Sequence, residues 1–366
     1  MLVHPKQLVP GCLITKDVMG KTIYPIIPKN TIINDKHVLV LTKFLIENVE
    51  VSDRLNTGIP FSPKELEKED AYKKENPIDS NDGHSSYSFY DYYINAVEGY
   101  KKLFLNWQSG ATLDINQVRK LIFPLFDQID QVGLNLYLLH QYSSKKDYFF
   151  HHCISIALIS AFLAKKRNFK KEWIQVGLAG LLADSGMAKI NRHLFSIERT
   201  LTLPEYEEIK KHPTYSYRLV EKVPSLSTGV KLAILQHHER LDGSGYPLGV
   251  EKNKIHPYAR ILAIVDTYHA MTSERIYQKR QSPFKVIEEM IQDQFAKFDH
   301  EILQTFIENL TSFSIGTRVQ LSNGKKGEIV FIEPNLPTRP MIKLEDNSQI
   351  ISLKANRNLH IEELLS

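Results

Sequence analysis

The sequence predicts a mainly α protein, a helical bundle flanked by small β-rich segments near both ends of the chain. Two segments, His152–Ala164 and Trp173–Ala183, are apolar nearly all round, which is typical of helices buried at the centre of a bundle. Apolar residues recur at helical spacing from about residue 88 to 310. Short apolar runs broken by Pro and Gly indicate strands before residue 60 and after residue 314.

The composition divides the chain into five segments. Residues 1–60 are expected to form a small β-rich N-terminal domain. Residues 63–86 are nearly all charged or turn-forming, so they bury too little apolar surface to offset their ordering entropy and are expected to be a linker. We expect a helical segment over 88–140, the main helical domain over 141–312, and a small β-barrel-like C-terminal domain over 314–366.

An aromatic stripe lies along one face of the first predicted helix. Its residues, at helical spacing, are Phe89, Tyr92, Tyr93, Val97 and Tyr100. The stripe is either part of the core or the seam of a homodimer, and the pattern alone does not distinguish the two.

Composition excludes several classes of protein. The net charge is +4, from 46 basic and 42 acidic residues, which is too small to indicate a DNA-binding protein. The longest nearly apolar stretch, Ile154–Ala164, is too short to span a bilayer, and the N-terminus lacks the pattern of a signal peptide. With only Cys12 and Cys153, a disulfide scaffold is not expected, and a cytoplasmic location fits best.

Polar residues within the apolar helices carry the chemical signal. An ionised Asp inside an apolar helix is costly unless it is paired or bound to a metal. Imidazole and carboxylate together suit Mn, Fe, Zn or Ni, and helices of a bundle can aim such groups at one point. Because five separate segments place them there, a shared metal site is favoured over separately satisfied core residues. The residues are His151, His152, Asp184, His212, His237, His238, Glu239 and Asp266.

These motifs together resemble the HD-GYP family of HD-superfamily phosphodiesterases, which hydrolyse the bacterial messenger cyclic di-GMP. The most specific piece is HHERLDGSGYP at 237–247, supported by HHCISIAL at 151–158, His212-Pro213 and IVDTYHAMTSERIY at 264–277. The resemblance covers roughly residues 140–310. It implies an HD-type all-α bundle that holds two or three metals, often iron or manganese.

The resemblance also implies roles for individual residues. Asp184, the bridging and catalytic Asp, would hold one metal together with His212, His237 and His238. A second metal would be held by His152, Asp266 and the shared Asp184. The implied substrate contacts are Arg275, on a phosphate, and Gly243, Gly245, Tyr246 and Lys279. We expect His151, Cys153 and His269 to be packing or surface residues rather than ligands.

The chain departs from the family pattern at several of these positions. Where the family has His-Asp-x-Gly-Lys, the sequence has Ala183-Asp-Ser-Gly-Met187. Ala cannot ligate a metal, and Met cannot offset the charge of a phosphate. Lys189 stands two residues further on, and Tyr148 occupies the position where some members have a Glu. We therefore expect one firm metal site and a second, weakened one.

Two functions of different classes remain open. The first is an enzyme, in which metal-assisted hydrolysis opens cyclic di-GMP or a related cyclic dinucleotide. The second is a catalytically degenerate signalling module that binds a nucleotide, or a partner protein through its Gly-Tyr-Pro loop. A mononucleotide hydrolase is disfavoured by the Gly-Tyr-Pro motif.

Overall fold

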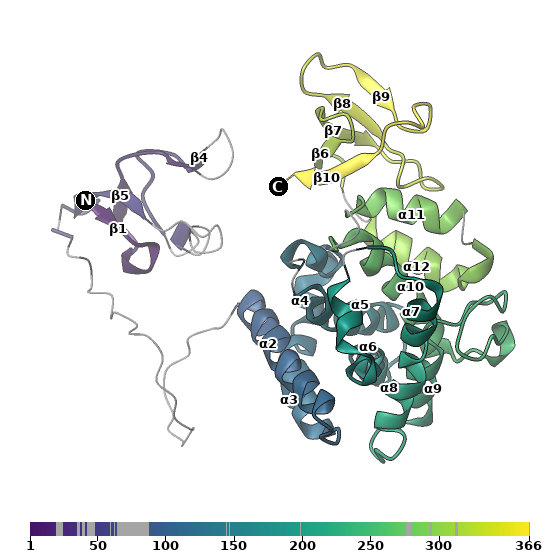
Figure 1. Cartoon of the computed structure of the whole chain (residues 1–366). Coiled ribbons are helices and arrows are strands. Elements are labelled where there is room, and N and C mark those ends of the chain that lie inside the picture. The colour runs from purple at the N-terminus through teal and green to yellow at the C-terminus, as the bar shows by residue number, and fades with distance from the viewer. Residues whose placement is uncertain are drawn as a thin grey trace, which may run out of the picture. The chain divides into compact units, whose positions relative to one another are not determined.

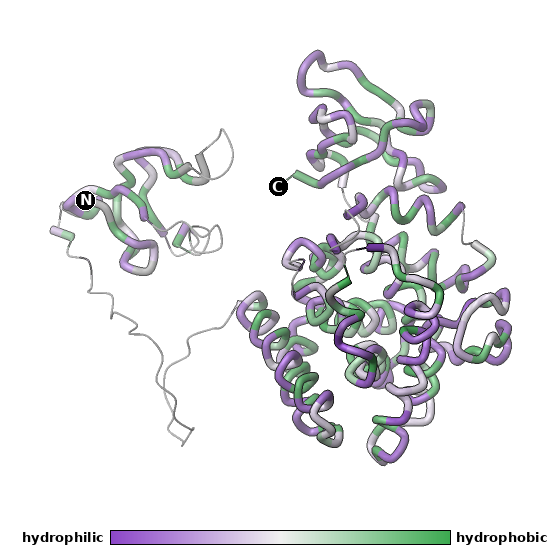
Figure 2. Tube along the Cα trace, in the orientation of Figure 1, coloured by the Kyte–Doolittle hydropathy of each residue, from purple (hydrophilic) through white to green (hydrophobic). Residues whose placement is uncertain are grey.

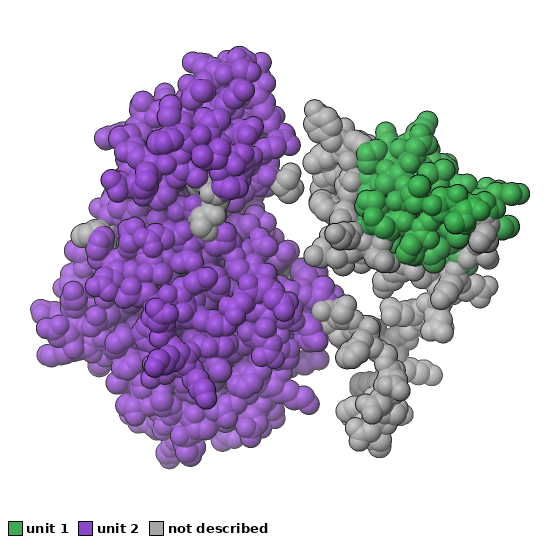
Figure 3. Space-filling view, turned by 180° about the vertical axis from the view of Figure 1, so that it is seen from behind, with its two compact units in different colours: residues 1–83 green, residues 84–366 purple. Residues whose placement is uncertain are grey.

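The computed structural model forms two compact units, Met1–Gly83 and His84–Ser366 (Figure 3). It describes residues 1–19, 25–34, 37–38, 41, 48–58, 60–61, 63, 88–143, 145, 147–197, 199–275, 280–292, 295–311 and 314–365. The linker predicted over 63–86, except for Pro63, lies outside the described residues, and so does Lys279. The predicted division of the second unit at residues 141 and 313 stays a prediction.

The N-terminal unit is built from short antiparallel strands around its own apolar core. Strand β5 lies between β1 and β2, and β3 pairs with β4. In β5, Val49 and Val51 point inward with an exposed Glu50 between them, the alternation expected of a strand with one buried face. The strands are β1 Leu2–Val3, β2 Cys12–Ile14, β3 Val18–Met19, β4 Pro25–Ile27 and β5 Val49–Leu55.

The second unit is a helical bundle, which confirms the predicted fold class (Figure 1). Its longer helices are α2 Phe89–Gln108, α3 Ile115–Phe126, α5 Tyr148–Lys166, α6 Trp173–Leu182, α8 His212–Val220, α9 Thr228–Gln236, α10 Pro257–Thr272, α11 Pro283–Gln292 and α12 His300–Leu310. Shorter helical pieces are α4 Ile129–Val132, η2 Gly133–Tyr142, η3 Ser185–Lys189, η4 Arg192–Ser196, α7 Leu203–Ile209, η5 Lys252–Lys254 and η6 Phe295–Lys297.

Helices α5 and α6 lie at the centre of the bundle, and α2, α9 and α10 pack against them. The aromatic stripe on α2 belongs to this core, because Tyr93, Val97 and Tyr100 are buried. Figure 2 shows hydrophobic and hydrophilic residues alternating along α2, the pattern of a helix with one face against a core. Of the two alternatives for the stripe, core or homodimer seam, these three residues therefore belong to the core.

Helix α5, Tyr148–Lys166, extends beyond the apolar stretch Ile154–Ala164 that the sequence predicts to be too short for a membrane span. At 19 residues it is long and apolar enough to cross a membrane by composition, but 78% of its apolar window is buried inside the protein. Its side chains pack against α6 and α10, as those of a central bundle helix do.

The strands predicted after residue 314 form a five-stranded antiparallel sheet in the order β10-β6-β7-β8-β9. Its inward residues share one apolar core with the bundle. The Ser282 hydroxyl donates to the Ile361 carbonyl, and Arg339 forms an ion pair with Glu288 on α11. The strands are β6 Arg318–Leu321, β7 Lys326–Phe331, β8 Met341–Leu344, β9 Ile350–Ser352 and β10 Ile361–Leu365.

Candidate metal centre

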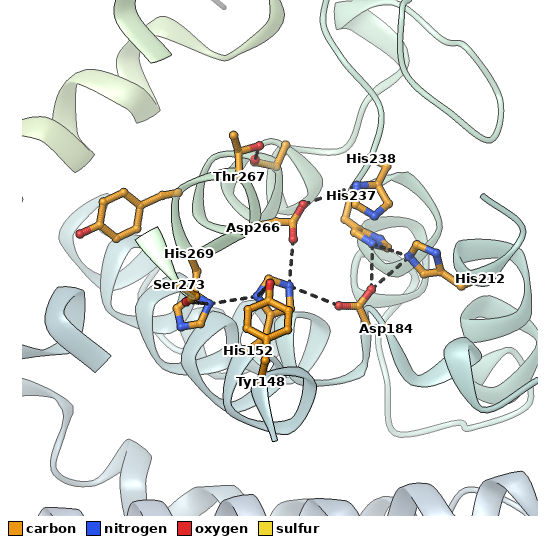
Figure 4. A network of polar contacts seen from close by, with 12 residues as sticks. Tyr148, His152, Asp184, His212, His237, His238, Asp266, Thr267, His269 and Ser273 are labelled. Atoms are coloured by element: carbon orange, nitrogen blue, oxygen red, sulfur yellow. Dashed lines mark hydrogen bonds and ion pairs between the residues drawn. The ribbon is translucent and has the colours of Figure 1, made fainter. Parts of the chain in front are cut away.

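The bundle brings together all six residues that the sequence analysis assigned to metals (Figure 4). Several of them stand at helix ends, where adjacent side chains can reach one point: Asp184 follows α6, His212 begins α8, and His237 and His238 follow α9. His152 and Asp266 lie within α5 and α10. Within a helix, two neighbouring side chains diverge by roughly 100° and could not both reach one site. His237 and His238 can do so because they lie just after the end of α9.

Four of these residues, which we call the metal cluster, form a compact set of donors. The donor atoms of Asp184, His212, His237 and His238 all lie within 4.8 Å of one another. His212 Nε2 is 3.0 Å and His237 Nε2 is 3.6 Å from the same oxygen, Asp184 Oδ1. The two Nε2 atoms are 3.2 Å apart. This set has the composition and spacing to hold one metal ion.

The backbone around the metal cluster selects the metal-binding tautomer of two histidines. His212 Nδ1 lies 2.8 Å from the Ile209 carbonyl, and His237 Nδ1 lies 2.8 Å from the Ile234 carbonyl. Each Nδ1 therefore donates its N–H to a carbonyl oxygen, which turns Nε2 toward Asp184 and leaves it, in the neutral ring, with a lone pair. Two such lone pairs facing each other beside a carboxylate repel unless a proton or a metal cation lies between them. The donor set thus fits a bound metal.

His152 and Asp266 form a second group beside the metal cluster. His152 Nε2 is 3.1 Å from Asp266 Oδ1 and 3.6 Å from Asp184 Oδ2. Asp266 Oδ2 is also 3.5 Å from His238 Nδ1. Asp184 therefore contacts both groups through different oxygens, which is the geometry that the predicted bridging Asp requires.

Burial and neighbouring charges shift the ionisation of the cluster. Burial would raise the pKa of the Asp184 carboxyl, but His212 and His237 hold that pKa well below its ordinary value. Although burial disfavours its charged form, the pKa of His237 is raised by Asp184. Burial and the neighbouring His237 lower the pKa of His238. The cluster thus keeps a carboxylate and at least one neutral imidazole, the ionisation states in which these groups bind metals.

A side chain that the sequence analysis missed holds Asp184 in place. The Ser216 hydroxyl on α8 donates to the Ala183 carbonyl at 2.6 Å and accepts from the Gly186 amide at 2.7 Å. A Cβ on Gly186 would lie 2.2 Å from the His212 carbonyl, so only glycine permits this contact between η3 and α8. The turn that carries Asp184 is thereby fastened beside His212. No spacing signal in the sequence marks Ser216.

The Gly-Tyr-Pro loop is anchored next to the metal cluster by Glu239. The buried Glu239 carboxylate accepts hydrogen bonds from the Leu248 amide at 2.6 Å and the Val250 amide at 3.1 Å. At Gly245, a Cβ would lie 2.4 Å from the Arg240 amide nitrogen, and Gly243 has a φ of +77°. Both glycines therefore have conformational roles here, and their predicted contacts with substrate stay predictions.

Glu239→Gln should destabilise this loop without emptying the metal site. The amide group would place an N–H donor against one of the two backbone N–H groups, and losing one charged hydrogen bond in a buried site costs about 2 kcal/mol. Urea unfolding and hydrogen exchange of residues 240–250 measure the effect. Glu251→Gln, an exposed change on the same loop, is the control. Unchanged exchange in Glu239→Gln would contradict this role.

Two tyrosines border the site, Tyr246 beside the metal cluster and Tyr148 beside the second group. The Tyr246 ring stacks on His238, with ring centroids 4.7 Å apart. Tyr148 places its hydroxyl 3.1 Å from His152 Nδ1, and the Arg275 guanidinium lies 4.8 Å from the centre of the Tyr148 ring. The structure thus places Tyr246 and Arg275, both predicted to bind substrate, beside the site.

His269 is buried, as expected of a packing residue, but it also contacts the site. Its Nδ1 lies 3.0 Å from His152 Nδ1 and 3.2 Å from the Ser273 hydroxyl. Burial and His152 lower its pKa well below the ordinary value, so it is a neutral neighbour of His152. His151 points elsewhere, with Nδ1 3.1 Å from the Tyr93 hydroxyl.

The departures from the family pattern leave the second group poorer in ligands. Ala183 is buried directly before Asp184 and offers no donor side chain, and Met187 packs against the apolar core. The Lys189 ammonium donates to the Trp107 carbonyl on α2 at 3.2 Å, so it does not replace the cation that Met187 lacks. Among the described residues, the metal cluster is the single group of three or more His, Cys, Asp or Glu donors with metal-binding spacing.

Comparisons with known proteins agree with this architecture. Residues 136–302 match the family model of the HD domain. The chain is 26% identical over 229 residues to a cyclic di-GMP phosphodiesterase of Pseudomonas aeruginosa, covering 62% of this chain and 55% of that protein. It is 25% identical over 354 residues to the cyclic di-GMP phosphodiesterase PdeB of Borreliella burgdorferi, covering 93% and 89%. It is 28% identical over 192 residues to the 3'3'-cGAMP-specific phosphodiesterase 1 of Vibrio cholerae, covering 51% and 44%.

A solved structure shares the fold. An HDG"Y"P protein from Bdellovibrio bacteriovorus superposes with a TM-score of 0.50 at 12% identity, covering 85% of this chain and 99% of that one. The chain spans about half the length of the Pseudomonas relative and nearly all of the Borreliella one. Residues 136–302 thus match an HD domain, and the relatives confirm the resemblance to HD-GYP phosphodiesterases that the sequence motifs carry.

Proposed function

We propose that this chain is a metal-dependent phosphodiesterase that hydrolyses cyclic di-GMP or a related cyclic dinucleotide in bacterial signalling. The observation that carries the proposal is the metal cluster, in which two histidine Nε2 atoms and a carboxylate oxygen lie 3.0–3.6 Å from one another. Relatives named as phosphodiesterases of cyclic di-GMP and of 3'3'-cGAMP support the substrate class. They give no comparable support to a degenerate signalling module.

The proposed role of each residue follows from its position in the site. Asp184, His212, His237 and His238 would hold one metal, while His152 and Asp266 with Asp184 would hold a second more weakly. Divalent metals in such a site, iron or manganese by family resemblance, supply Lewis-acid chemistry at a phosphodiester. Asp184 contacts both groups and so fixes their separation. Tyr148 and Tyr246 border the site, and Arg275 supplies a cation for a substrate phosphate.

Metal analysis of the purified chain beside a hydrolysis assay tests the proposal. At least one transition metal per chain, with opening of cyclic di-GMP to its linear form, is the expected result. Bound metal without binding or hydrolysis of any cyclic dinucleotide would favour the alternative, a module that signals through a partner protein. A partner at the Gly-Tyr-Pro loop and a homodimer stay predictions.

A cytoplasmic location is part of the same proposal. Cys12 and Cys153 are both free and buried, which agrees with a reducing compartment. Cyclic dinucleotide messengers of the kind named for the relatives would reach the enzyme there.

Arg275→Ala should weaken the binding of cyclic di-GMP about tenfold or more, because a charge-assisted contact with phosphate contributes about 1.5–3 kcal/mol. Metal content should not change, since a guanidinium is not a metal ligand and the Arg275 contact that the structure describes is with Tyr148. Arg275→Lys should restore the affinity only in part, because Lys cannot donate in a bidentate fork. Calorimetry measures both effects, and the exposed Arg280→Ala is the control. Equal affinities for wild type and Arg275→Ala would exclude this role.

A further inference from the structure

Two cations lie over tyrosine rings at the border of the site, Arg275 over Tyr148 and Lys210 over Tyr246. The Lys210 ammonium is 5.5 Å from the centre of the Tyr246 ring, which itself stacks on His238. Arg275 stands in the same relation to Tyr148, beside His152. Asp266 contacts both His152 and His238 and lies between these two ends. The site is therefore bordered by two tyrosine and cation pairs, one at each end.

The segment that presents Lys210 has few other reasons to be ordered. None of the residues of α7 is buried. The helix is held instead by a capping box between Thr202 and Glu205 and by a bidentate ion pair of Glu205 with Arg199. A helix without a buried face receives little stabilisation from packing against the core. Lys210 directly follows α7, so the capping box and the ion pair that order this helix also fix where Lys210 begins.

The Lys210 ammonium lies over two tyrosine rings, and 28% of the side chain is exposed. Its ammonium lies 5.4 Å from the centre of the Tyr206 ring and 5.5 Å from that of Tyr246, so two rings fix its direction. Its ion partner, Glu207, is 2.9 Å away and about half exposed, so this pair contributes little free energy. A phosphate oxygen can therefore replace Glu207 at small cost.

Other cations near the cluster are committed to the protein itself. The Arg240 guanidinium donates to the His237 and Glu239 carbonyls and to the Thr267 hydroxyl. Lys189 donates to the Trp107 carbonyl. Either cation would have to give up these hydrogen bonds to the protein before it could turn to a substrate.

We infer that Lys210, held between Tyr206 and Tyr246, binds the phosphodiester of the cyclic dinucleotide that is not being hydrolysed. This inference rests on the proposed function. A cyclic dinucleotide carries two phosphodiester anions, and only one can lie on the metal cluster. Arg275 meets the reacting phosphate from the His152 end, and Lys210 meets the other one beyond Tyr246. Lys210 is thus a specificity-determining residue for substrates that have two phosphates.

The test compares a substrate with two phosphates and one with a single phosphate. Lys210→Met keeps the apolar stem between the rings and removes the charge, and Lys210→Arg keeps both. Lys211→Met is a matched control, because Lys211 forms the same type of ion pair, with Glu208, but has no contact with Tyr246 among those the structure describes. The measurements are the affinity of the full-length protein for cyclic di-GMP by calorimetry, and the kcat and KM for cyclic di-GMP and for bis(p-nitrophenyl) phosphate.

Lys210→Met should weaken cyclic di-GMP binding about tenfold and raise its KM with little change in kcat. Lys210→Arg and Lys211→Met should bind as the wild type does, and turnover of bis(p-nitrophenyl) phosphate should be the same in all four proteins. Wild-type affinity in Lys210→Met, with binding lost in Arg275→Ala, would overturn the role of Lys210 and leave the proposed function intact. Equal losses on both substrates would also overturn it. A wild type that neither binds nor opens cyclic di-GMP would refute the proposed function, and the role of Lys210 with it.

Discussion

Protein in which both His237 and His238 are replaced by alanine should purify without a bound transition metal, whereas the wild type should carry at least one per chain. The two rings supply two of the four donors that lie within 4.8 Å of one another. Asp184 and His212 alone would leave a metal with two protein ligands, fewer than the three or four of stable protein sites. Elemental analysis after dialysis measures the loss.

The control for this experiment is His151→Ala. His151 is as buried as His152 and adjacent to it in sequence, but its ring contacts Tyr93 and not the cluster. It should keep the full metal content. Full metal content in the His237→Ala, His238→Ala protein, with circular dichroism showing an intact fold, would mean that the ligand assignment is wrong.

Ala183→His should raise the occupancy of the second metal position, and Met187→Lys added to it should raise hydrolysis further. The wild type has His152, Asp266 and a share of Asp184 there, one imidazole fewer than the family pattern. Losing a metal that assists phosphoryl chemistry costs several kcal/mol of transition-state stabilisation, so restoring it should accelerate hydrolysis about 10²-fold or more. Metal stoichiometry and turnover of wild type, single and double variants test this.

Position 183 is buried, so the new ring must find room beside Asp184. Ala188→His, which adds the same ring at another buried position, in η3 after Asp184, separates the effect of ligation from that of crowding. Two firmly bound metals and rapid turnover in the wild type would refute the weakened second site. Two metals in the double variant without any turnover would favour a binding role, with the defect elsewhere in the pocket.

The sequence predicted the helical bundle and the residues that meet at its centre. Apolar helices with His or Asp at particular positions are visible in the sequence, because burying such groups is costly enough to require a purpose. The choice of His152 over its neighbour His151 came from the family resemblance. The structure agrees with it, since His152 faces Asp266 and Asp184 while His151 faces Tyr93.

Other parts of the site could not be predicted, because they depend on contacts between distant segments. Ser216 holds the turn around Asp184 through Ala183 and Gly186, which lie 33 and 30 residues before it in the chain. The direction of a long side chain is especially hard to predict from sequence. Lys189 is near Met187 in the sequence, but its ammonium donates to the Trp107 carbonyl on another helix. Lys210 carries no motif, and only the folded chain brings its ammonium to the Tyr246 ring, which lies 36 residues further along the sequence.

Residue types and their order along the chain were enough to predict the class of fold and the His, Asp and Glu residues within the apolar helices, because these depend on residue type and helical periodicity, which are local. The choice of six metal residues among them, and the groups that Ala183 and Met187 lack, came from the family resemblance. The folded chain was needed to learn which donors converge, which tautomers His212 and His237 adopt, and which cations reach the site. Those depend on distances of a few Å between segments far apart in the chain, and the free energies of such contacts are set by packing rather than by the sequence around each residue.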